Sequence, residues 1–468
     1  MSAPLLGWYG DDFTGATDTL AVLTQAGLRA MLFMGVPGGA QQAAAAHALG
    51  GPLHAVGIAG ASRSMAPAAM EAELEPAGAF FAALGSRVLH YKVCSTFDSA
   101  PEVGSIGVAV RVLRRHVRNA FVPVVGGQPN LGRYCAFSNL FAAAGSGAAV
   151  ERIDRHPTMR NHPMTPMKEA DLRRHLALQG LQPVAGLHYP VYAENQDAQQ
   201  GVLRRLLDGA AAVLLDVTEP AQLAAIGNLI WQQAQQSPLL AVGPSGVAQA
   251  LIAHWQESGQ MPAPEQCAPR DGQGLQPAKS PVFVFAGSLS PITARQVRAA
   301  KSFQQVALDA GELLDSPGYA AKVQAEISRH LLAGRHVLAY TASANGNPPD
   351  TSKSAALARA TARCVKAIVD GQAVRGAPLR RMGIAGGDTS SLAVKALGVW
   401  GLSYRAALGA GVCVSVTHSD DPALDGMELM LKGGQMGSED VFERLLGDPL
   451  PPHGHPRRCE HTPSQPAP

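Results

Sequence analysis

Short apolar runs alternate with Ala- and Leu-rich stretches along most of the chain, and this alternation constrains the fold more than any other feature. Most runs are followed by polar or glycine-rich residues, and they lie at 53–58, 88–93, 120–125, 212–215, 239–242, 282–286, 336–340, 382–385 and 412–416. Short apolar strands separated by helical stretches are typical of parallel sheets covered by helices. The sequence therefore predicts an α/β protein with mainly parallel sheets.

A chain of 468 residues is long for a single hydrophobic core, so two domains are expected. The apolar periodicity breaks at 257–280, where Gly, Pro and Gln replace it, and restarts afterwards. We therefore predict an N-terminal domain at 1–256, a linker at 257–280 and a second α/β domain at 281–446, with the active site in the cleft between the domains. The proline-rich tail at 447–468 is predicted to be disordered.

Composition and charge narrow the class of partner. A formal net charge of +2 and the lack of an aromatic-interleaved basic stripe argue against a nucleic-acid surface. No apolar run approaches the roughly 18 residues needed to cross a bilayer, and the N-terminus lacks the pattern of a signal peptide. We therefore expect a cytoplasmic protein with a small-molecule partner and no membrane or nucleic-acid partner.

A polar turn follows the first apolar run of the chain. It holds the carboxylates of Asp11, Asp12 and Asp18 and the hydroxyls of Thr14 and Thr17, and an apolar helical pattern follows it. Small ligands of α/β proteins bind at the carboxyl ends of strands, and crowded carboxylates are costly without a ligand or cation. A helix cap by Asp12 or Thr14 is the alternative, although one cap does not require three carboxylates. The motif predicts a site for a small polar ligand.

Three glycine-rich turns, 287–290, 386–391 and 432–437, follow apolar runs in the second half of the chain. Paired glycines let the backbone approach an anion, and the hydroxyl-rich start of the following helix offers hydrogen-bond donors. Three unrelated tight turns are the alternative, because Gly-Gly-Asp also suits ordinary turns. Repetition within one domain favours a nucleotide site at which the turns converge.

Two familiar nucleotide fingerprints are absent from the sequence. Neither Gly-Lys-Ser nor Gly-Lys-Thr occurs, which excludes a standard P-loop, and no Gly-x-Gly-x-x-Gly follows a predicted strand, which weakens a Rossmann dehydrogenase.

Taken together, the motifs resemble those of the four-carbon acid sugar kinase family, in the same order and over almost the whole chain. They are Gly10 to Asp18, 161–167, Gly287-Ser288, 386–390 and 432–440. The resemblance implies a sugar-acid-binding N-terminal domain, an ATP-binding C-terminal domain and transfer of the γ-phosphoryl group to a substrate hydroxyl. The implied substrates are small sugar acids of carbohydrate acid catabolism, either four-carbon acids or 3-oxo acids, including branched ones such as 3-oxo-isoapionate. A homodimer is a habit of such enzymes and not an inference from these residues.

The resemblance also implies roles for individual residues. Asp12, ahead of Asp11, would orient or deprotonate the attacking hydroxyl, and Mg²⁺ would be held largely by ATP oxygens and water, with no protein metal ligand assigned. The implied nucleotide contacts are Ser288, Gly386, Gly387, Asp388, Thr389 and Gly434. The implied substrate contacts are Asp11, Asp12, Thr14, Lys92, Ser95, Thr96, Arg133, Arg160 and His162.

One stretch departs from the family pattern. The family typically has Ser-Thr-Leu-Arg-Gly-Asn after its lysine, whereas Asp98 stands here where that arginine would be. The partner of the substrate carboxylate would then come from Lys92, Arg133 or Arg160. A solvated strand-end lysine, a surface arginine and, for His162, a loop hydrogen-bond partner are the plainer alternatives.

Two other functions fit parts of the sequence. A two-domain sugar-acid-binding or regulatory protein without chemistry would have a similar layout, but it would have no need of the second glycine-rich set. A nicotinamide-dependent oxidoreductase on sugar acids would require the glycine spacing and the ribose-binding acid that the chain lacks.

Overall fold

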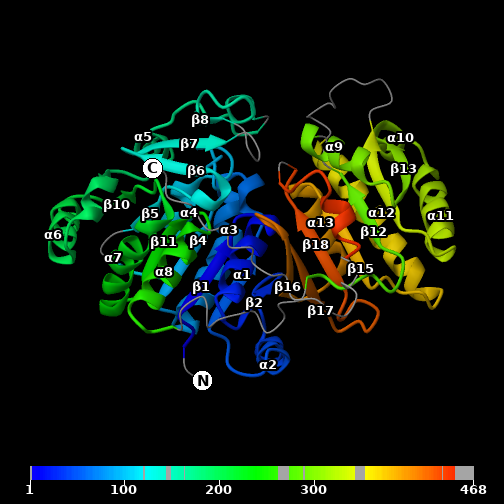
Figure 1. Cartoon of the computed structure of the whole chain (residues 1–468), viewed down its shortest axis with the longest axis horizontal. Coiled ribbons are helices and arrows are strands. Elements are labelled where there is room, and N and C mark those ends of the chain that lie inside the picture. The colour runs from blue at the N-terminus through cyan, green and yellow to red at the C-terminus, as the bar shows by residue number, and fades with distance from the viewer. Residues whose placement is uncertain are drawn as a thin grey trace, which may run out of the picture.

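The computed structural model describes residues 3–119, 122–143, 149–162, 164–261, 274–287, 290–342, 354–434 and 436–447 (Figure 1). Its strands are β1 (Leu6–Gly10), β2 (Ala30–Phe33), β3 (Ala55–Ala59), β4 (Val88–Lys92), β5 (Val122–Val125), β6 (Arg133–Ala136), β7 (Asn139–Ala143), β8 (Val150–Arg152), β9 (Val184–Leu187), β10 (Ala212–Leu215), β11 (Leu239–Gly243), β12 (Phe283–Ala286), β13 (Gln304–Asp309), β14 (Val337–Ala342), β15 (Arg381–Ala385), β16 (Gly401–Gly409), β17 (Val412–His418) and β18 (Glu428–Lys432). Its α-helices are α1 (Phe13–Gln25), α2 (Gly39–Ala48), α3 (Pro67–Leu84), α4 (Ile106–Leu113), α5 (Leu172–Leu178), α6 (Gln196–Leu207), α7 (Leu223–Gln236), α8 (Gly246–Glu257), α9 (Pro291–Ala299), α10 (Ala310–Asp315), α11 (Tyr319–Leu332), α12 (Ser354–Val374), α13 (Gly387–Leu397) and α14 (Val441–Arg444).

The strands of both halves join in one sheet, in the order β13-β14-β12-β15-β18-β17-β16-β2-β3-β1-β4-β11-β5-β10-β9. All neighbours in it are parallel except β18-β17, β17-β16 and β16-β2. The predicted fold class, two α/β halves with mainly parallel strands, is confirmed. The sequence did not predict that the two halves share a sheet.

The junction between the halves is the antiparallel pairing of β16 with β2. Gly401 lies opposite Phe33 and Leu402 opposite Leu32, and the Phe33 ring stacks on Trp400 at 6.1 Å between centroids. An unpaired edge strand presents free backbone groups to solvent. Because β2 and β16 cover each other's edge, neither half keeps an open edge at this point.

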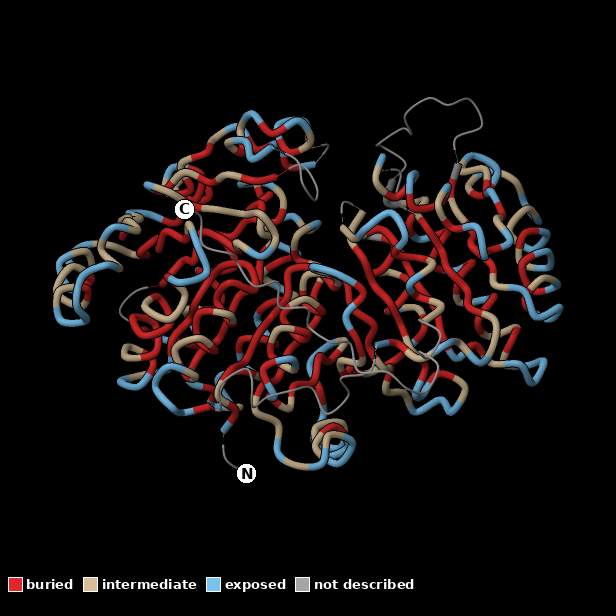
Figure 2. Tube along the Cα trace, in the orientation of Figure 1, coloured by how far each residue is buried: buried red, intermediate tan, exposed pale blue. Residues whose placement is uncertain are grey.

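Helices cover both faces of the sheet, so the strands are the most deeply buried part of the molecule (Figure 2). Trp8 and Tyr9 of β1 show why, because successive strand residues point to opposite faces and both rings are at most 1% exposed. Trp8 packs in a core that α1, α7, α8, α12 and α13 cover, and Tyr9 packs under α3 and α4.

A small antiparallel sheet, β6-β7-β8, projects from the N-terminal half. The β6–β7 turn places Phe137 and Ser138 at positive φ (48° and 67°), and their amides donate to the fully buried carboxylate of Asp216 at 2.7 and 2.9 Å. A carboxylate satisfied by backbone N–H groups tolerates burial. Asp216 therefore fixes this turn to the main sheet.

The predicted domain boundaries stay predictions. In the structure α8 ends at Glu257 and β12 begins at Phe283. Residues 262–273 of the predicted linker and 448–468 of the predicted tail lie outside the described residues.

Candidate active site

Strands β1, β3 and β4 are parallel neighbours, so the residues after them meet at one edge of the sheet. Asp11 and Asp12 follow β1, Arg63 lies in the short 3₁₀ turn Ser62–Ser64 after β3, and Lys92 ends β4. The Asp11 amide donates to the Lys92 carbonyl at 2.9 Å and extends the ladder by one bond. The topology therefore assembles two carboxylates and two cations from three separate segments.

The Arg63 guanidinium binds both carboxylates. Its Nη2 lies 2.7 Å from Asp11 Oδ1, its Nε 3.1 Å from Asp11 Oδ2, and its Nη1 3.0 Å from Asp12 Oδ2. Burial raises the pKa of Asp11 above its usual value, and the positive charge of Arg63 only partly opposes this. Burial would lower the pKa of Arg63, but Asp11 and Asp12 outweigh it and keep the arginine charged. The crowded carboxylates predicted from the sequence thus have a cation from this chain.

Asp12 also caps helix α1. The helix cap that was the alternative expectation from the sequence is therefore present together with the cluster of charged side chains. Its Oδ1 accepts from the Gly15 amide at 2.7 Å, and its Oδ2 accepts from Thr14 Oγ1 at 2.7 Å. Lys92 is only 3% exposed and donates to the Val93 carbonyl at 2.8 Å, so it is not a solvated strand-end residue. A Cβ atom at Gly15 would lie 2.5 Å from Asp12 Oδ1 and 2.7 Å from Lys92 Nζ, which places the ammonium beside the cap.

The loop after β4 brings a third carboxylate to this edge. Asp98 is buried, and its Oδ1 accepts from Thr96 Oγ1 at 2.6 Å. Burial would raise the pKa of Asp98, but Arg63, His162 and the Thr96 hydroxyl together hold it below the usual value. Asp98 is therefore a fixed negative charge beside Arg63, and His162 lies close enough to act on it.

Three other predicted substrate residues are placed less directly. Arg133 Nη1 donates to the carbonyls of Leu131 and Ala143 at 2.8 and 2.9 Å, so this end of its guanidinium stabilises its own hairpin. Its Nε is buried without a hydrogen-bond partner among the described residues. Arg160 is exposed, and Ser95 is half-buried in the loop after β4. Arg160 therefore matches the surface alternative.

The three glycine-rich turns of the C-terminal half lie at one edge of the sheet. They follow β12, β15 and β18, which are parallel neighbours. The Gly287 amide donates to the Ala385 carbonyl at 2.9 Å, and the Gly386 amide donates to the Lys432 carbonyl at 2.9 Å. Backbone hydrogen bonds thus link all three turns at one edge of the sheet.

At two positions in these turns, backbone conformation or close packing requires glycine. Gly386 has a φ of 122°, a conformation that L side chains rarely adopt. A Cβ atom at Gly287 would lie 2.4 Å from Thr389 Oγ1, so only glycine lets the first turn approach α13 this closely. Ser288 and the side chain of Asp388 lie outside the described residues.

Helix α9 holds the third turn in place. Ser290 Oγ and Thr293 Oγ1 both donate to the Gly434 carbonyl, the latter at 3.1 Å. Gln296 Nε2 donates to the carbonyls of Met436 and Ser438 at 3.0 and 2.9 Å. The turn that carries Gly434 is therefore fixed by side chains of a helix that itself starts at the first turn.

The acidic site and the glycine turns face each other across the junction of the two halves. A Cβ atom at Gly387, the first residue of α13, would lie 4.0 Å from Asp12 Oδ2, and one at Gly433 would lie 4.0 Å from Thr14 Oγ1. Lys395 of α13 lies 5.7 Å from the centre of the Phe13 ring, a cation–π contact between the same two helices. In Figure 1, α1 and α13 accordingly lie on either side of the junction.

Within the described ranges, no group of three or more His, Cys, Asp or Glu side chains is placed to hold a metal ion. Of the helices that the structure describes, none combines the length and apolar character needed to cross a bilayer.

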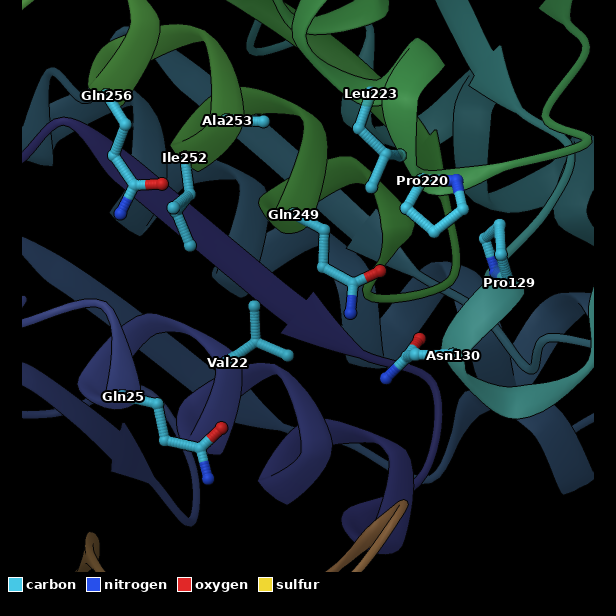
Figure 3. Close-up of a pocket in the computed structure, with 10 residues that line it drawn as sticks. All are labelled: Val22, Gln25, Pro129, Asn130, Pro220, Leu223, Gln249, Ile252, Ala253 and Gln256. Atoms are coloured by element: carbon cyan, nitrogen blue, oxygen red, sulfur yellow. The ribbon is translucent and has the colours of Figure 1, made fainter. Parts of the chain in front are cut away.

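A separate pocket of about 290 Å³ opens between α1, α8 and the turns that carry Asn130 and Pro220 (Figure 3). Apolar groups such as Val22, Leu223 and Ile252 and carboxamides such as Gln249 line it. No charged side chain and no glycine turn borders it. It is therefore distinct from the acidic site.

Sequence reasoning missed two residues of the site. Arg63 received no role, although it follows the apolar run at 53–58 and the rule that polar residues after parallel strands meet at one edge applies to it. Lys432 was noted only as part of a glycine-rich turn, because its complete burial is not visible in the sequence.

Two family models together cover most of the chain. A sugar-binding N-terminal domain matches residues 6–251, and a nucleotide-binding C-terminal domain matches residues 283–442. Fold and site therefore define a two-domain protein with a sugar-binding and a nucleotide-binding half.

Similar proteins narrow this class. The chain is 36% identical to a 3-oxo-isoapionate kinase of Paraburkholderia graminis, over 94% of this chain and 93% of the relative. It is 30% identical to a 3-oxo-tetronate kinase of Pseudomonas savastanoi pv. phaseolicola, over 95% and 97% of the two chains. The chain belongs to the four-carbon acid sugar kinase family, and the family confirms the expected enzyme class, a kinase of sugar acids.

Solved structures agree on the fold. A Salmonella typhimurium LT2 protein aligns with a TM-score of 0.71 and 23% identity, covering 95% of this chain and 98% of that one. A Haemophilus influenzae protein aligns with a TM-score of 0.64 and 23% identity, covering 94% and 99%.

Proposed function

We propose that this chain is an ATP-dependent kinase that phosphorylates a hydroxyl of a small sugar acid held between the Asp11–Asp12 motif and the glycine turns. One observation carries the proposal: Asp12 Oδ2 lies 4.0 Å from the Cβ position of Gly387, where the turn of the nucleotide-binding half begins its helix. Phosphoryl transfer requires the attacking hydroxyl and the γ-phosphate in line and in contact. A carboxylate on one side and a phosphate cradle on the other provide this arrangement.

The nucleotide would lie over Gly386, Gly387, Thr389 and Gly434. Amide donors at the start of α13 and the positive end of its dipole favour the phosphate chain. Mg²⁺ would be held mainly by phosphate oxygens and water, because Arg63 already binds the carboxylates of Asp11 and Asp12. Bound Mg²⁺ neutralises phosphate charge during transfer. We propose that the reaction takes place in the cytoplasm, where ATP is available as the donor.

Asp12 is the residue that we assign to orient the attacking hydroxyl and accept its proton. Its Oδ2 lies 4.0 Å from the Cβ position of Gly387, and its orientation is fixed by Arg63 and the Gly15 amide. Fixed orientation is what a general base needs, since misplacement by about 1 Å can cost 10²-fold in rate.

The substrate would be a branched 3-oxo acid of the 3-oxo-isoapionate type. The similarity to the Paraburkholderia graminis kinase supports this class. Lys92, buried beside Asp12, is the cation that we assign to the substrate carboxylate. Within the part of the chain that the structure describes, its Nζ donates to the Val93 carbonyl alone, which leaves two of its three N–H donors for a ligand. Asp98, a fixed anion, would instead accept a hydrogen bond from a substrate hydroxyl.

A coupled ADP-release assay tests the proposal. Mg·ATP would be supplied with threonate, erythronate, 3-oxo-tetronates and 3-oxo-isoapionate, and we expect turnover with the branched 3-oxo acid. If no acid on this panel releases ADP, the kinase assignment to these substrates is wrong. Sugar-acid binding without ADP release would favour the binding-protein alternative, and a nicotinamide absorbance change would favour the oxidoreductase.

The Asp12→Asn variant tests the assigned base. Asparagine caps helices as well as aspartate does, so α1 should keep its start. Loss of the proton acceptor should lower kcat by about 10²–10⁴-fold, with the KM for ATP nearly unchanged. Asp11→Asn is the matched control, because Asp11 binds the same arginine but is not assigned as the base. Full activity of Asp12→Asn would remove Asp12 from this role.

A further inference from the structure

Lys432 is a completely buried lysine at the point where the glycine turns meet. It is 0% exposed and is the last residue of β18. Its Nζ donates to the Gly433 carbonyl at 2.9 Å and to Thr293 Oγ1 at 3.3 Å. Both acceptors are uncharged, and they use two of the three donors of an ammonium group.

The surroundings of Lys432 contrast with those of Arg63. Arg63 is held by two carboxylates, whereas no acidic side chain among the described residues forms an ion pair with Lys432 that would offset its burial. Burial alone lowers the pKa of Lys432 to about 7. A buried cation without a counter-charge is costly, and a lysine responds by losing its proton. The site therefore favours an anion as the missing partner.

The backbone of Lys432 ties the same position to the phosphate cradle. Its carbonyl accepts from the Gly386 amide at 2.9 Å, and its side-chain partner Thr293 donates to the Gly434 carbonyl at 3.1 Å. Lys432 thus contacts, directly or through one hydroxyl, the two turns to which the nucleotide was assigned. An anion bound by these turns would lie next to the ammonium group.

We propose that Lys432 is a phosphate-binding residue of the nucleotide site, whose ammonium group donates its remaining hydrogen bond to a phosphate oxygen of ATP. This inference rests on the proposed function, since it takes the bound anion to be the nucleotide. A lysine acts at a phosphate as a point charge, and complete burial strengthens the interaction by excluding water.

A proton is taken up when this contact forms above neutral pH. The free site holds a neutral amine, and the phosphate stabilises the ammonium form, so the amine gains one proton from solvent as the nucleotide binds. The groups that contact Nζ, the Gly433 carbonyl from its own strand end and the Thr293 hydroxyl from α9, do not titrate near neutrality. The proton is therefore assigned to Lys432 itself.

Calorimetry with an unreactive nucleotide measures this proton. The probe is the β,γ-imido analogue of ATP with Mg²⁺, titrated into the full chain in buffers of different ionisation enthalpy at pH 6 and pH 8. With a free pKa of about 7, uptake should rise from roughly 0.1 proton at pH 6 to roughly 0.9 at pH 8. Affinity should weaken about tenfold per pH unit above 7.

Two variants separate this proton from those of the nucleotide and other groups. Lys432→Met should bind the analogue at least tenfold more weakly and lose the difference in proton uptake between pH 6 and pH 8. Lys432→Arg keeps a charge that does not titrate, so it should bind without that difference and with a nearly constant affinity. If one variant fails to fold, comparison of the unaltered chain with the other variant still decides the question.

The outcomes are distinct. Binding of the analogue with equal proton uptake at both pH values, or with the same uptake in Lys432→Met, would overturn the role of Lys432 and leave the kinase assignment intact. No binding by the unaltered chain would refute the proposed nucleotide site, and the inference with it.

Discussion

Replacing Arg63 by Met tests whether the acidic site depends on its internal cation. The side chain of Arg63 is 24% exposed, and those of Asp11 and Asp12 are 7% and 11% exposed. Removing one partner of a buried ion pair costs about 3–5 kcal/mol. Because Arg63 keeps some contact with solvent, we expect the lower end, a loss of about 3 kcal/mol in the free energy of unfolding at pH 8.

The loss should depend on pH in a fixed direction. Burial already raises the pKa of Asp11 against the opposing charge of Arg63, so loss of Arg63 should raise it further. A carboxyl whose pKa is higher in the folded than in the unfolded state destabilises the fold above its unfolded pKa. Protonation relieves this as the pH falls through the raised value. Each unit of such a shift is worth about 1.4 kcal/mol, so the defect should be at least about 1 kcal/mol smaller at pH 5 than at pH 8.

Urea unfolding followed by tryptophan fluorescence measures this effect. Three of the four tryptophans, Trp8, Trp231 and Trp255, are buried in the N-terminal half, so the signal reports mainly on the part that holds Arg63. The matched control is Arg111→Met, which breaks the surface ion pair of Arg111 with Glu71. These side chains are 56% and 37% exposed, so the variant should lower the free energy of unfolding by less than about 0.5 kcal/mol. Adding Asp11→Asn to Arg63→Met should restore part of the stability. Equal losses in the two single variants, or a loss that does not change with pH, would refute the reasoning.

Three further predictions concern single residues. Gly386→Ala places a side chain at a φ of 122°, a strain of about 1–3 kcal/mol. It should raise the KM for ATP at least tenfold, whereas Gly398→Ala, also at positive φ but at the far end of α13, should leave the KM unchanged; equal KM values would contradict this. Asp216→Asn removes the buried charge that binds two turn amides and should lower unfolding stability by about 2 kcal/mol in urea; an unchanged midpoint would show that the charge is not needed. The pKa of Lys432 is lowered to about 7 in the folded chain, so burial of the charged lysine reduces folding stability most below pH 7. This loss of stability becomes smaller as the pH rises from 7 toward the ordinary pKa of lysine. The unaltered chain should therefore gain about 2 kcal/mol relative to Lys432→Met between pH 7 and pH 9, and parallel pH profiles would contradict this.

Much of the fold and part of the site could be predicted from local pattern. Apolar runs predicted strands such as β10 and β12 closely, because a buried parallel strand must be apolar on both faces. The same reasoning placed Asp12 and Gly386 at carboxyl strand ends, since parallel strands end at one edge of the sheet. These features depend only on neighbouring residues and on the direction of the strand.

Other features depend on which distant segments pair. The sequence by itself determined the α/β class, the sugar-acid kinase family and the turns that carry Asp12 and Gly386. Only the tertiary structure decided that β16 pairs with β2, that Arg63 binds both aspartates, and that Lys432 is buried without a carboxylate among the described residues. The reason is physical: strand pairing and the desolvation of a charge are set by segments far apart in the chain, and no local pattern records how closely they approach.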